Sequence, residues 1–161
     1  MQALNAFYLD NKPLWENDTN WQGFAWISHD DNVNNIIAFR RIAKDGSDLI
    51  CVVNFAPVYH ESYKIGVPYA GTYEEVFSSD RVEFGGGGTA NGKKRTKAEE
   101  MHGMEQIIDL QIPPLSVLYL KGKPRAKRRV KAEPAAKITA KRTTKKASVR
   151  SKTAKKPGEK S

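Results

Sequence analysis

The chain has 161 residues and a formal net charge of +9 at pH 7, which leaves room for one ordinary domain and an extension. Residues 121–161 hold 17 Lys or Arg and 2 Glu (+15), whereas residues 1–120 hold 10 basic and 16 acidic residues (−6). The basic balance therefore belongs to the end of the chain and not to its body. No run approaches the roughly 18 apolar residues of a membrane span, so no membrane partner is expected.

The chain opens with a short predicted helix. Pro13 ends a pattern of apolar side chains at helical spacing, which are Ala3, Leu4, Phe7, Tyr8 and Leu9. We expect residues 1–20 to contain the end of a helix and a linker.

From Gly23 onward the pattern changes to short strands. Residues 24–29, 36–42 and 49–55 are predicted strands, and Asp45 and Gly46 lie between the last two. An Asp-Gly pair between apolar runs is a strong hairpin signal, because glycine accepts a positive φ without steric cost. Further strands are expected at 63–67, 72–77, 105–112 and 116–120, with a polar loop before residue 100. The pattern predicts an all-β fold, an antiparallel β-sandwich over residues 21–121.

Alternation along these strands also predicts a core, because successive side chains of a strand point to opposite faces. The candidates are Ile37, Phe39, Cys51, Val53, Phe55, Val76, Ile108, Leu110, Val117 and Tyr119. Cys51 is the only cysteine and cannot form an internal disulfide. Its apolar neighbours predict a buried, reduced thiol and a cytoplasmic location.

Residues 122–161 are predicted to be a disordered tail rich in Lys, Arg and Ala. The only sizeable apolar side chains there are Val130, Ile138 and Val149, too few to offset about 1–2 kcal/mol of backbone entropy per residue. The dense positive charge would displace counterions from nucleic acid, so weak, non-specific binding of nucleic acid is an alternative function. A tail that only keeps the chain solvated is the simpler interpretation.

Five motifs together resemble the C-terminus of bacterial 1,4-alpha-glucan branching enzymes, a family of the alpha-amylase class. They are LWEND (14–18), WQGFAWISHDDN (21–32), NFAP (54–57), MHG (101–103) and LQIPPLSVLYLK (110–121). In that family a (β/α)8 barrel carries out the chemistry and a small β-sandwich follows it. The resemblance implies that this chain is the sandwich, an alpha-amylase-type C-terminal domain, with the last helix leading into it.

The resemblance also implies that the chain has no catalytic residue of its own. The family's nucleophilic Asp, acid/base Glu and transition-state-stabilising Asp lie in the barrel, upstream of everything that aligns here. The acidic pairs at 30–31, 74–75 and 99–100 are sequence neighbours, which is typical of solvated surface rather than of two carboxyl groups about 5–5.5 Å apart across a glycosidic bond. We expect an accessory role in glycogen biosynthesis, with the catalytic barrel, on the parent enzyme or a complementary chain, and α-glucan as partners.

No metal or cofactor site is expected. His29, His60 and His102 are far apart in sequence and complete no ligand motif. The glycine run at 85–88 lacks the G-x-x-x-x-G-K-[ST] pattern of a phosphate-binding loop, and a flexible connection between strands explains it.

All three tryptophans fall within residues 15–26. Aromatic faces stack on the C–H faces of glucose rings, whereas burial in a core or interface is their commonest role. Trp15 and Trp21 are the candidate glucan contacts, because they lie among polar residues whose side chains can bond sugar hydroxyls. Trp26 lies in a predicted strand and is expected in the core or facing the barrel. An apolar patch is expected around Phe7, Leu14 and neighbouring Tyr8 and Trp15, where the barrel would lie.

Overall fold

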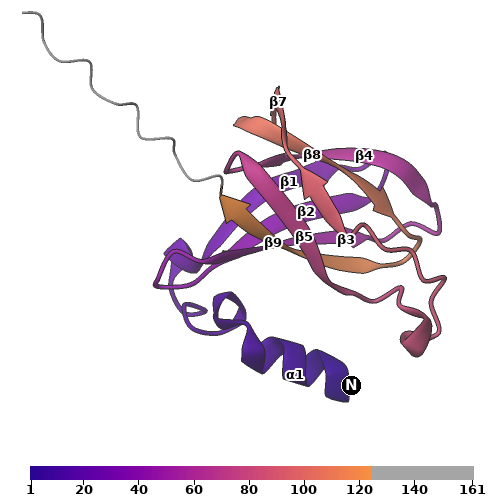
Figure 1. Cartoon of the computed structure of the whole chain (residues 1–161), viewed down its shortest axis with the longest axis horizontal. Coiled ribbons are helices and arrows are strands. Elements are labelled where there is room, and N and C mark those ends of the chain that lie inside the picture. The colour runs from indigo at the N-terminus through magenta and orange to yellow at the C-terminus, as the bar shows by residue number, and fades with distance from the viewer. Residues whose placement is uncertain (125–161) are drawn as a thin grey trace, which may run out of the picture. The chain divides into compact units, whose positions relative to one another are not determined.

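The computed structural model describes residues 1–124, which form a sandwich of two antiparallel sheets with a helix beside it (Figure 1). The larger sheet has the order β1-β2-β3-β9-β5-β6 and the smaller one the order β4-β8-β7. The helix is α1 (Gln2–Asp10), and the strands are β1 (Phe24–Asp31), β2 (Ile36–Ile42), β3 (Asp48–Asn54), β4 (His60–Val67), β5 (Gly71–Ser78), β6 (Lys93–Arg95), β7 (Lys97–Met101), β8 (Met104–Ile112) and β9 (Val117–Pro124). The predicted all-β fold and opening helix are confirmed.

The turn between β2 and β3 forms where the Asp-Gly pair predicts it. Gly46 has φ +81°, a left-handed conformation that glycine adopts without a steric penalty. Asp45 Oδ1 accepts hydrogen bonds from the Ser47 backbone N–H at 2.8 Å and from the Ser47 hydroxyl at 2.6 Å. The position of this turn therefore sets the register in which β2 pairs with β3.

The core lies between the two sheets and differs from the predicted one. Of the ten predicted core side chains, only Cys51, Ile108 and Leu110 are buried, and Phe55 is 60% exposed. The remaining six are half-buried: Ile37, Phe39, Val53, Val76, Val117 and Tyr119. The side chains that face the smaller sheet are their sequence neighbours, including Ile36, Ala38, Ile50, Val52, Leu118 and Leu120. Both alternating sets are apolar in these strands, so alternation does not decide which set faces inward.

Two strands lie within the stretch predicted to be a polar loop. Strands β6 and β7 are at the edges of their sheets and are held by backbone pairing with β5 and β8. Edge strands keep polar and charged side chains, which is why hydropathy does not reveal them. Strand β9 also continues past residue 122, where the tail was predicted to begin, because it pairs with β5 up to Pro124. The rest of the predicted tail, residues 125–161, lies outside the described residues.

None of the helices within residues 1–124 is both long enough and apolar enough to cross a membrane.

The division of the chain into a linker, a sandwich domain and a tail, with boundaries at residues 20 and 121, remains a prediction.

Asn54 joins the end of β3 to the turn that precedes β9. Its side-chain amide donates to the carbonyl oxygens of Val58 at 2.8 Å and Pro113 at 2.9 Å, and its Oδ1 accepts from the Ala56 backbone N–H at 2.9 Å. The side chain is buried. Loss of this amide would leave three backbone groups without their partner, of which the Pro113 carbonyl takes part in a buried bond and the other two in part-buried bonds.

We therefore expect Asn54→Ala to lower the free energy of unfolding by about 3 kcal/mol, the cost of leaving buried polar groups unpaired. Urea denaturation followed by tryptophan fluorescence measures the change. The matched control is Asn32→Ala at an exposed position, which should change the stability by less than about 0.5 kcal/mol. Equal stabilities of the two variants would contradict a structural role for Asn54.

Candidate functional site

The larger sheet has an outer face, defined as the face turned away from the smaller sheet. Cross-strand pairing joins Trp26 to Phe39, Phe39 to Cys51, Cys51 to Tyr119, and Tyr119 to Phe77. Directly opposed residues of antiparallel strands place their side chains on the same face. These five side chains therefore form one row across β1, β2, β3, β9 and β5, which we call the aromatic row.

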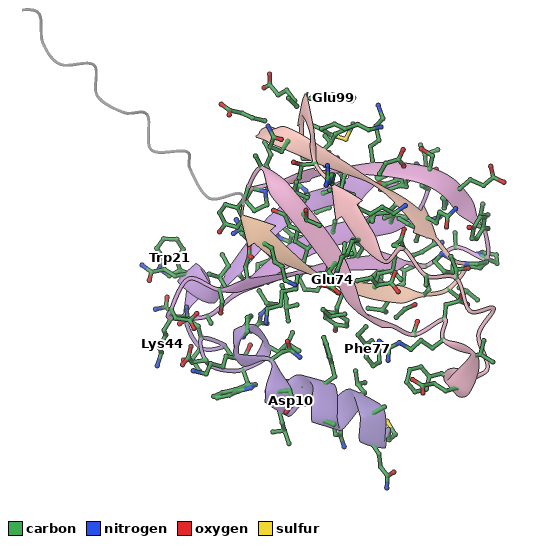
Figure 2. All side chains as sticks on the ribbon, in the orientation of Figure 1. Asp10, Trp21, Lys44, Glu74, Phe77 and Glu99 are labelled. Carbon is green, nitrogen blue, oxygen red and sulfur yellow. The ribbon has the colours of Figure 1, made fainter. Side chains whose placement is uncertain are left out.

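Helix α1 covers one end of the aromatic row. The Phe7 ring lies 4.9 Å from the Phe77 ring and 5.0 Å from the Tyr119 ring, measured between centroids. Figure 2 labels Phe77 between the sheet and α1. No residue of α1 is fully buried. The helix therefore rests on the sheet through Phe7 and leaves much of its own apolar surface uncovered.

Two apolar grooves flank α1 on the outer face. One has a volume of about 470 Å³ and the other about 360 Å³. The first is lined by Met1, Leu4, Phe77, Ser79, Phe84, Val117 and Tyr119, and the second by Leu4, Asn5, Tyr8, Leu14, Phe39, Arg41 and Tyr119. Tyr8 and Leu14 are thus part of an apolar surface, as the sequence predicts.

The other end of the aromatic row is uncovered within the described residues. The Phe24 ring meets the Trp26 ring edge-on at 4.8 Å and stacks on the Phe39 ring at 5.3 Å. Trp26 is 50% exposed, which excludes the core; the other expected position, facing the barrel, stays a prediction. An aromatic cluster on an open sheet face is the kind of apolar surface at which proteins meet a partner.

Cys51, at the centre of the row, is an unreactive thiol. Burial raises its pKa to about 12, although a hydrogen bond with Tyr119 acts in the opposite direction. Burial likewise raises the pKa of Tyr119 to about 12. The thiolate is the nucleophilic form of cysteine, and almost none is present near neutral pH. The row is therefore a packing surface and not a site of covalent chemistry.

The two predicted glucan contacts occupy different settings. Trp21 lies in a short 3-10 helix before β1 and is 82% exposed (Figure 2). Trp15 is 40% exposed, and its indole N–H donates to the Leu9 carbonyl oxygen at 3.3 Å. Within residues 1–124 the two rings form no direct aromatic contact. The two rings are therefore separate exposed aromatic surfaces.

The polar side chains around these tryptophans hold the loop in place. Glu16 Oε2 accepts from the Lys44 backbone N–H at 3.0 Å, and Asp18 Oδ1 accepts from Arg41 at 2.5 Å. Gly23 lies so close to the Asn17 carbonyl oxygen that an added Cβ would be 2.1 Å away. The loop is therefore fixed by the sheet beneath it, and these two carboxylates already have protein partners.

Three carboxylates from two of the acidic pairs, those of Glu74, Glu75 and Asp31, are bound by other side chains. Glu74 accepts from Lys123 Nζ on one face of β5, whereas Glu75 accepts from Asn91 in the opposite direction. Asp31 accepts from the Tyr63 hydroxyl at 2.5 Å; burial acts to raise its pKa, but this bond and those from Asn34 outweigh it and lower the pKa. In the described part of the chain, no cluster of three or more His, Cys, Asp or Glu side chains is arranged to hold a metal ion.

Comparison with known proteins places these features in context. Residues 26–123 match the family described as the alpha amylase C-terminal all-beta domain. The chain is 48% identical over 122 residues to a 1,4-alpha-glucan branching enzyme of Prochlorococcus marinus (strain NATL1A), a match that covers 74% of this chain and 16% of that enzyme. The likeness suggested by the five motifs is thereby confirmed.

Two further branching enzymes show the same extent of similarity. The one from Synechococcus sp. (strain CC9311) is 41% identical over 127 residues, covering 78% of this chain and 17% of that enzyme. The one from Francisella tularensis subsp. tularensis (strain SCHU S4 / Schu 4) is 43% identical over 122 residues, covering 74% of this chain and 19% of that enzyme. The chain thus spans less than a fifth of the length of these relatives.

Proposed function

This chain belongs to the family of alpha amylase C-terminal all-beta domains, and from that premise we propose that it is the accessory domain of a 1,4-alpha-glucan branching enzyme. In such an enzyme a catalytic barrel cleaves an α-1,4 glucan and transfers the cut chain to a glucose 6-hydroxyl, forming the α-1,6 branches of glycogen. The names and similarity of the relatives support the choice of enzyme.

The observation that carries the proposal is the aromatic row on the outer face. Phe7 of α1 covers its Phe77 and Tyr119 end, while Trp26 at the other end is half exposed. A sandwich that stood alone would be expected to present a polar outer face to water. The catalytic barrel, either on the same polypeptide or on a complementary chain, is the partner that would cover the remainder.

The proposed role is structural support and not catalysis. Retaining transfer between glucans needs two carboxyl groups about 5–5.5 Å apart on either side of the scissile bond. Glu74 and Glu75 point to opposite faces of β5, and Asp31 is held by Tyr63 and Asn34. We therefore assign the chemistry to the barrel.

A branching assay on amylose tests this assignment. We expect the purified chain alone to leave the iodine colour unchanged and to form no α-1,6 linkage, because we assign the required carboxylate pair to the barrel. The positive control is the intact Prochlorococcus enzyme in the same assay, and circular dichroism verifies that the chain is folded. Branching by the chain after removal of contaminating enzyme would contradict the accessory role.

We also propose that Trp21 and Trp15 contact glucan. The exposed Trp21 ring is available for stacking on a sugar, and its loop is held rigidly by bonds to β2 and to the turn after it. A rigid, exposed aromatic side chain loses little conformational entropy when a ligand stacks on it. Trp15 offers a smaller exposed area and would contribute less.

We expect Trp21→Ala to weaken binding of a linear maltodextrin about three- to tenfold, and Trp15→Ala to weaken it less, as loss of an aromatic stacking contact implies. Affinity electrophoresis in gels containing glycogen, followed by calorimetry with maltoheptaose, measures the change. Tyr59→Ala removes another exposed aromatic ring outside this loop and is the matched control. Equal affinity of the Trp21 and Tyr59 variants would refute the assignment.

Two other expectations remain proposals. The buried, unpaired thiol of Cys51 supports a reducing, cytoplasmic setting. Binding of nucleic acid through the basic tail concerns residues outside the described part of the chain.

A further inference from the structure

Two cationic side chains flank one threonine at the β6 end of the larger sheet. Thr72 of β5 is paired with Arg95 of β6 on one side and with Lys123 of β9 on the other. Neighbouring strands lie about 4.8 Å apart, so the Cα atoms of the two cationic residues are roughly 10 Å apart with Thr72 between them. Paired residues share a face of the sheet, so the long side chains of Arg95 and Lys123 can converge on a group that sits above the Thr72 hydroxyl.

These three residues line a hollow of about 870 Å³ at this end of the sandwich. Thr96 and Gln106 add polar groups to the wall, and Ala98 adds an apolar surface. The hollow lies within the usual 300–1,000 Å³ range for small-molecule sites. Its size exceeds the needs of a lone inorganic ion.

The charges of the hollow are not balanced within the described residues. No Asp or Glu is among the described residues of its wall. The Arg95 side chain forms no hydrogen bond or ion pair with another of residues 1–124. The carboxylate of Glu74, two residues along β5 from Thr72, is shared between Lys123 Nζ at 3.0 Å and Lys93 Nζ at 3.7 Å. An anion in the hollow would therefore meet a free guanidinium and a lysine that is only partly neutralised.

We infer that this hollow binds a phosphate monoester of a hexose. The phosphate sits between Arg95 and Lys123, because guanidinium and ammonium groups form strong, charge-assisted hydrogen bonds with phosphate oxygens. It also accepts a hydrogen bond from the Thr72 hydroxyl. The sugar then extends past Gly71, at the start of β5, toward Thr96 and Gln106, which line the same hollow. The choice of phosphate rests on the charges alone, whereas the choice of a hexose rests on the proposed role in glucan metabolism.

Calorimetry on the full chain at low ionic strength, with glucose 6-phosphate as the probe, tests the inference. Glucose and inorganic phosphate are the comparison ligands, and both should bind more weakly because each offers only half of the contacts. The same phosphate group can be carried on a glucan or on a free sugar, and a maltodextrin phosphorylated at a 6-hydroxyl distinguishes these two sources. Tighter binding of the dextrin assigns the site to a phosphate carried on a glucan, and tighter binding of glucose 6-phosphate assigns it to a free sugar phosphate.

Two substitutions with opposite expected signs localise the site. Arg95→Gln should weaken binding of glucose 6-phosphate about tenfold or more, as loss of a charge-assisted hydrogen bond implies. Glu74→Gln should strengthen binding about two- to fivefold, because Lys123 is released and a repelling charge is removed. Lys44→Gln removes one exposed charge far from Glu74 and should have no effect (Figure 2).

The opposite changes in affinity expected for Arg95→Gln and Glu74→Gln distinguish binding in the hollow from binding by the basic tail, because all the variants have the same tail. Unchanged affinity in both Arg95→Gln and Glu74→Gln would overturn the inference and assign anion binding to the tail. Equal affinity for inorganic phosphate and glucose 6-phosphate would overturn the sugar assignment. The branching assay on the chain is independent of these results, so failure of the phosphate site is distinguishable from failure of the accessory role.

Discussion

The arrangement of this chain depends on one larger sheet that is apolar on both faces. Strand β3 illustrates the constraint, since Ile50 and Val52 point into the sandwich while Cys51 between them is just as buried on the outer face. A sheet of this kind needs a cover on each side, because exposed apolar surface costs roughly 25 cal/mol per Å² relative to burial. The smaller sheet packs on one face and closes the core. Helix α1 covers the other only in part, through Phe7.

This constraint connects the fold to the proposed role. The aromatic row exists because neighbouring strands place aromatic residues directly opposite one another, from Trp26 on β1 to Phe77 on β5. Beyond the aromatic row, toward β6, the same sheet becomes cationic around Thr72. The outer face therefore combines a surface suited to a protein partner with an end suited to an anionic ligand, and the two need not compete.

The amino-acid sequence predicts the local features well and the long-range ones poorly. The Asp45-Gly46 turn, the opening helix and most of the strands are recognisable because their signals span only a few residues. The inward face of the sheet is not recognisable, since Ile36 and Ile37 are equally apolar and only tertiary packing distinguishes them. Strands β6 and β7 escape notice because edge strands carry polar side chains.

The candidate sites likewise divide into those that local sequence predicts and those that depend on long-range packing. The exposure of Trp21 agrees with its polar surroundings, whereas the position of Trp26 depends on which face of β1 the core selects. Arg95 and Lys123 stand on either side of Thr72 through pairing of segments far apart in the chain. Nothing in local composition brings those three residues together, so only the sheet register reveals the hollow.

Oxidative footprinting of the aromatic side chains tests the central claim most directly. The folded chain is labelled alone and after addition of the Prochlorococcus branching enzyme truncated to remove its own matching segment, and mass spectrometry reports the oxidation of each residue. Burial of the outer face against the barrel predicts strong protection of Trp26 and unchanged labelling of Tyr59, an exposed residue that directly precedes β4 of the smaller sheet. Unchanged labelling of Trp26 in a complex that does form would contradict the assignment of the outer face as the barrel contact.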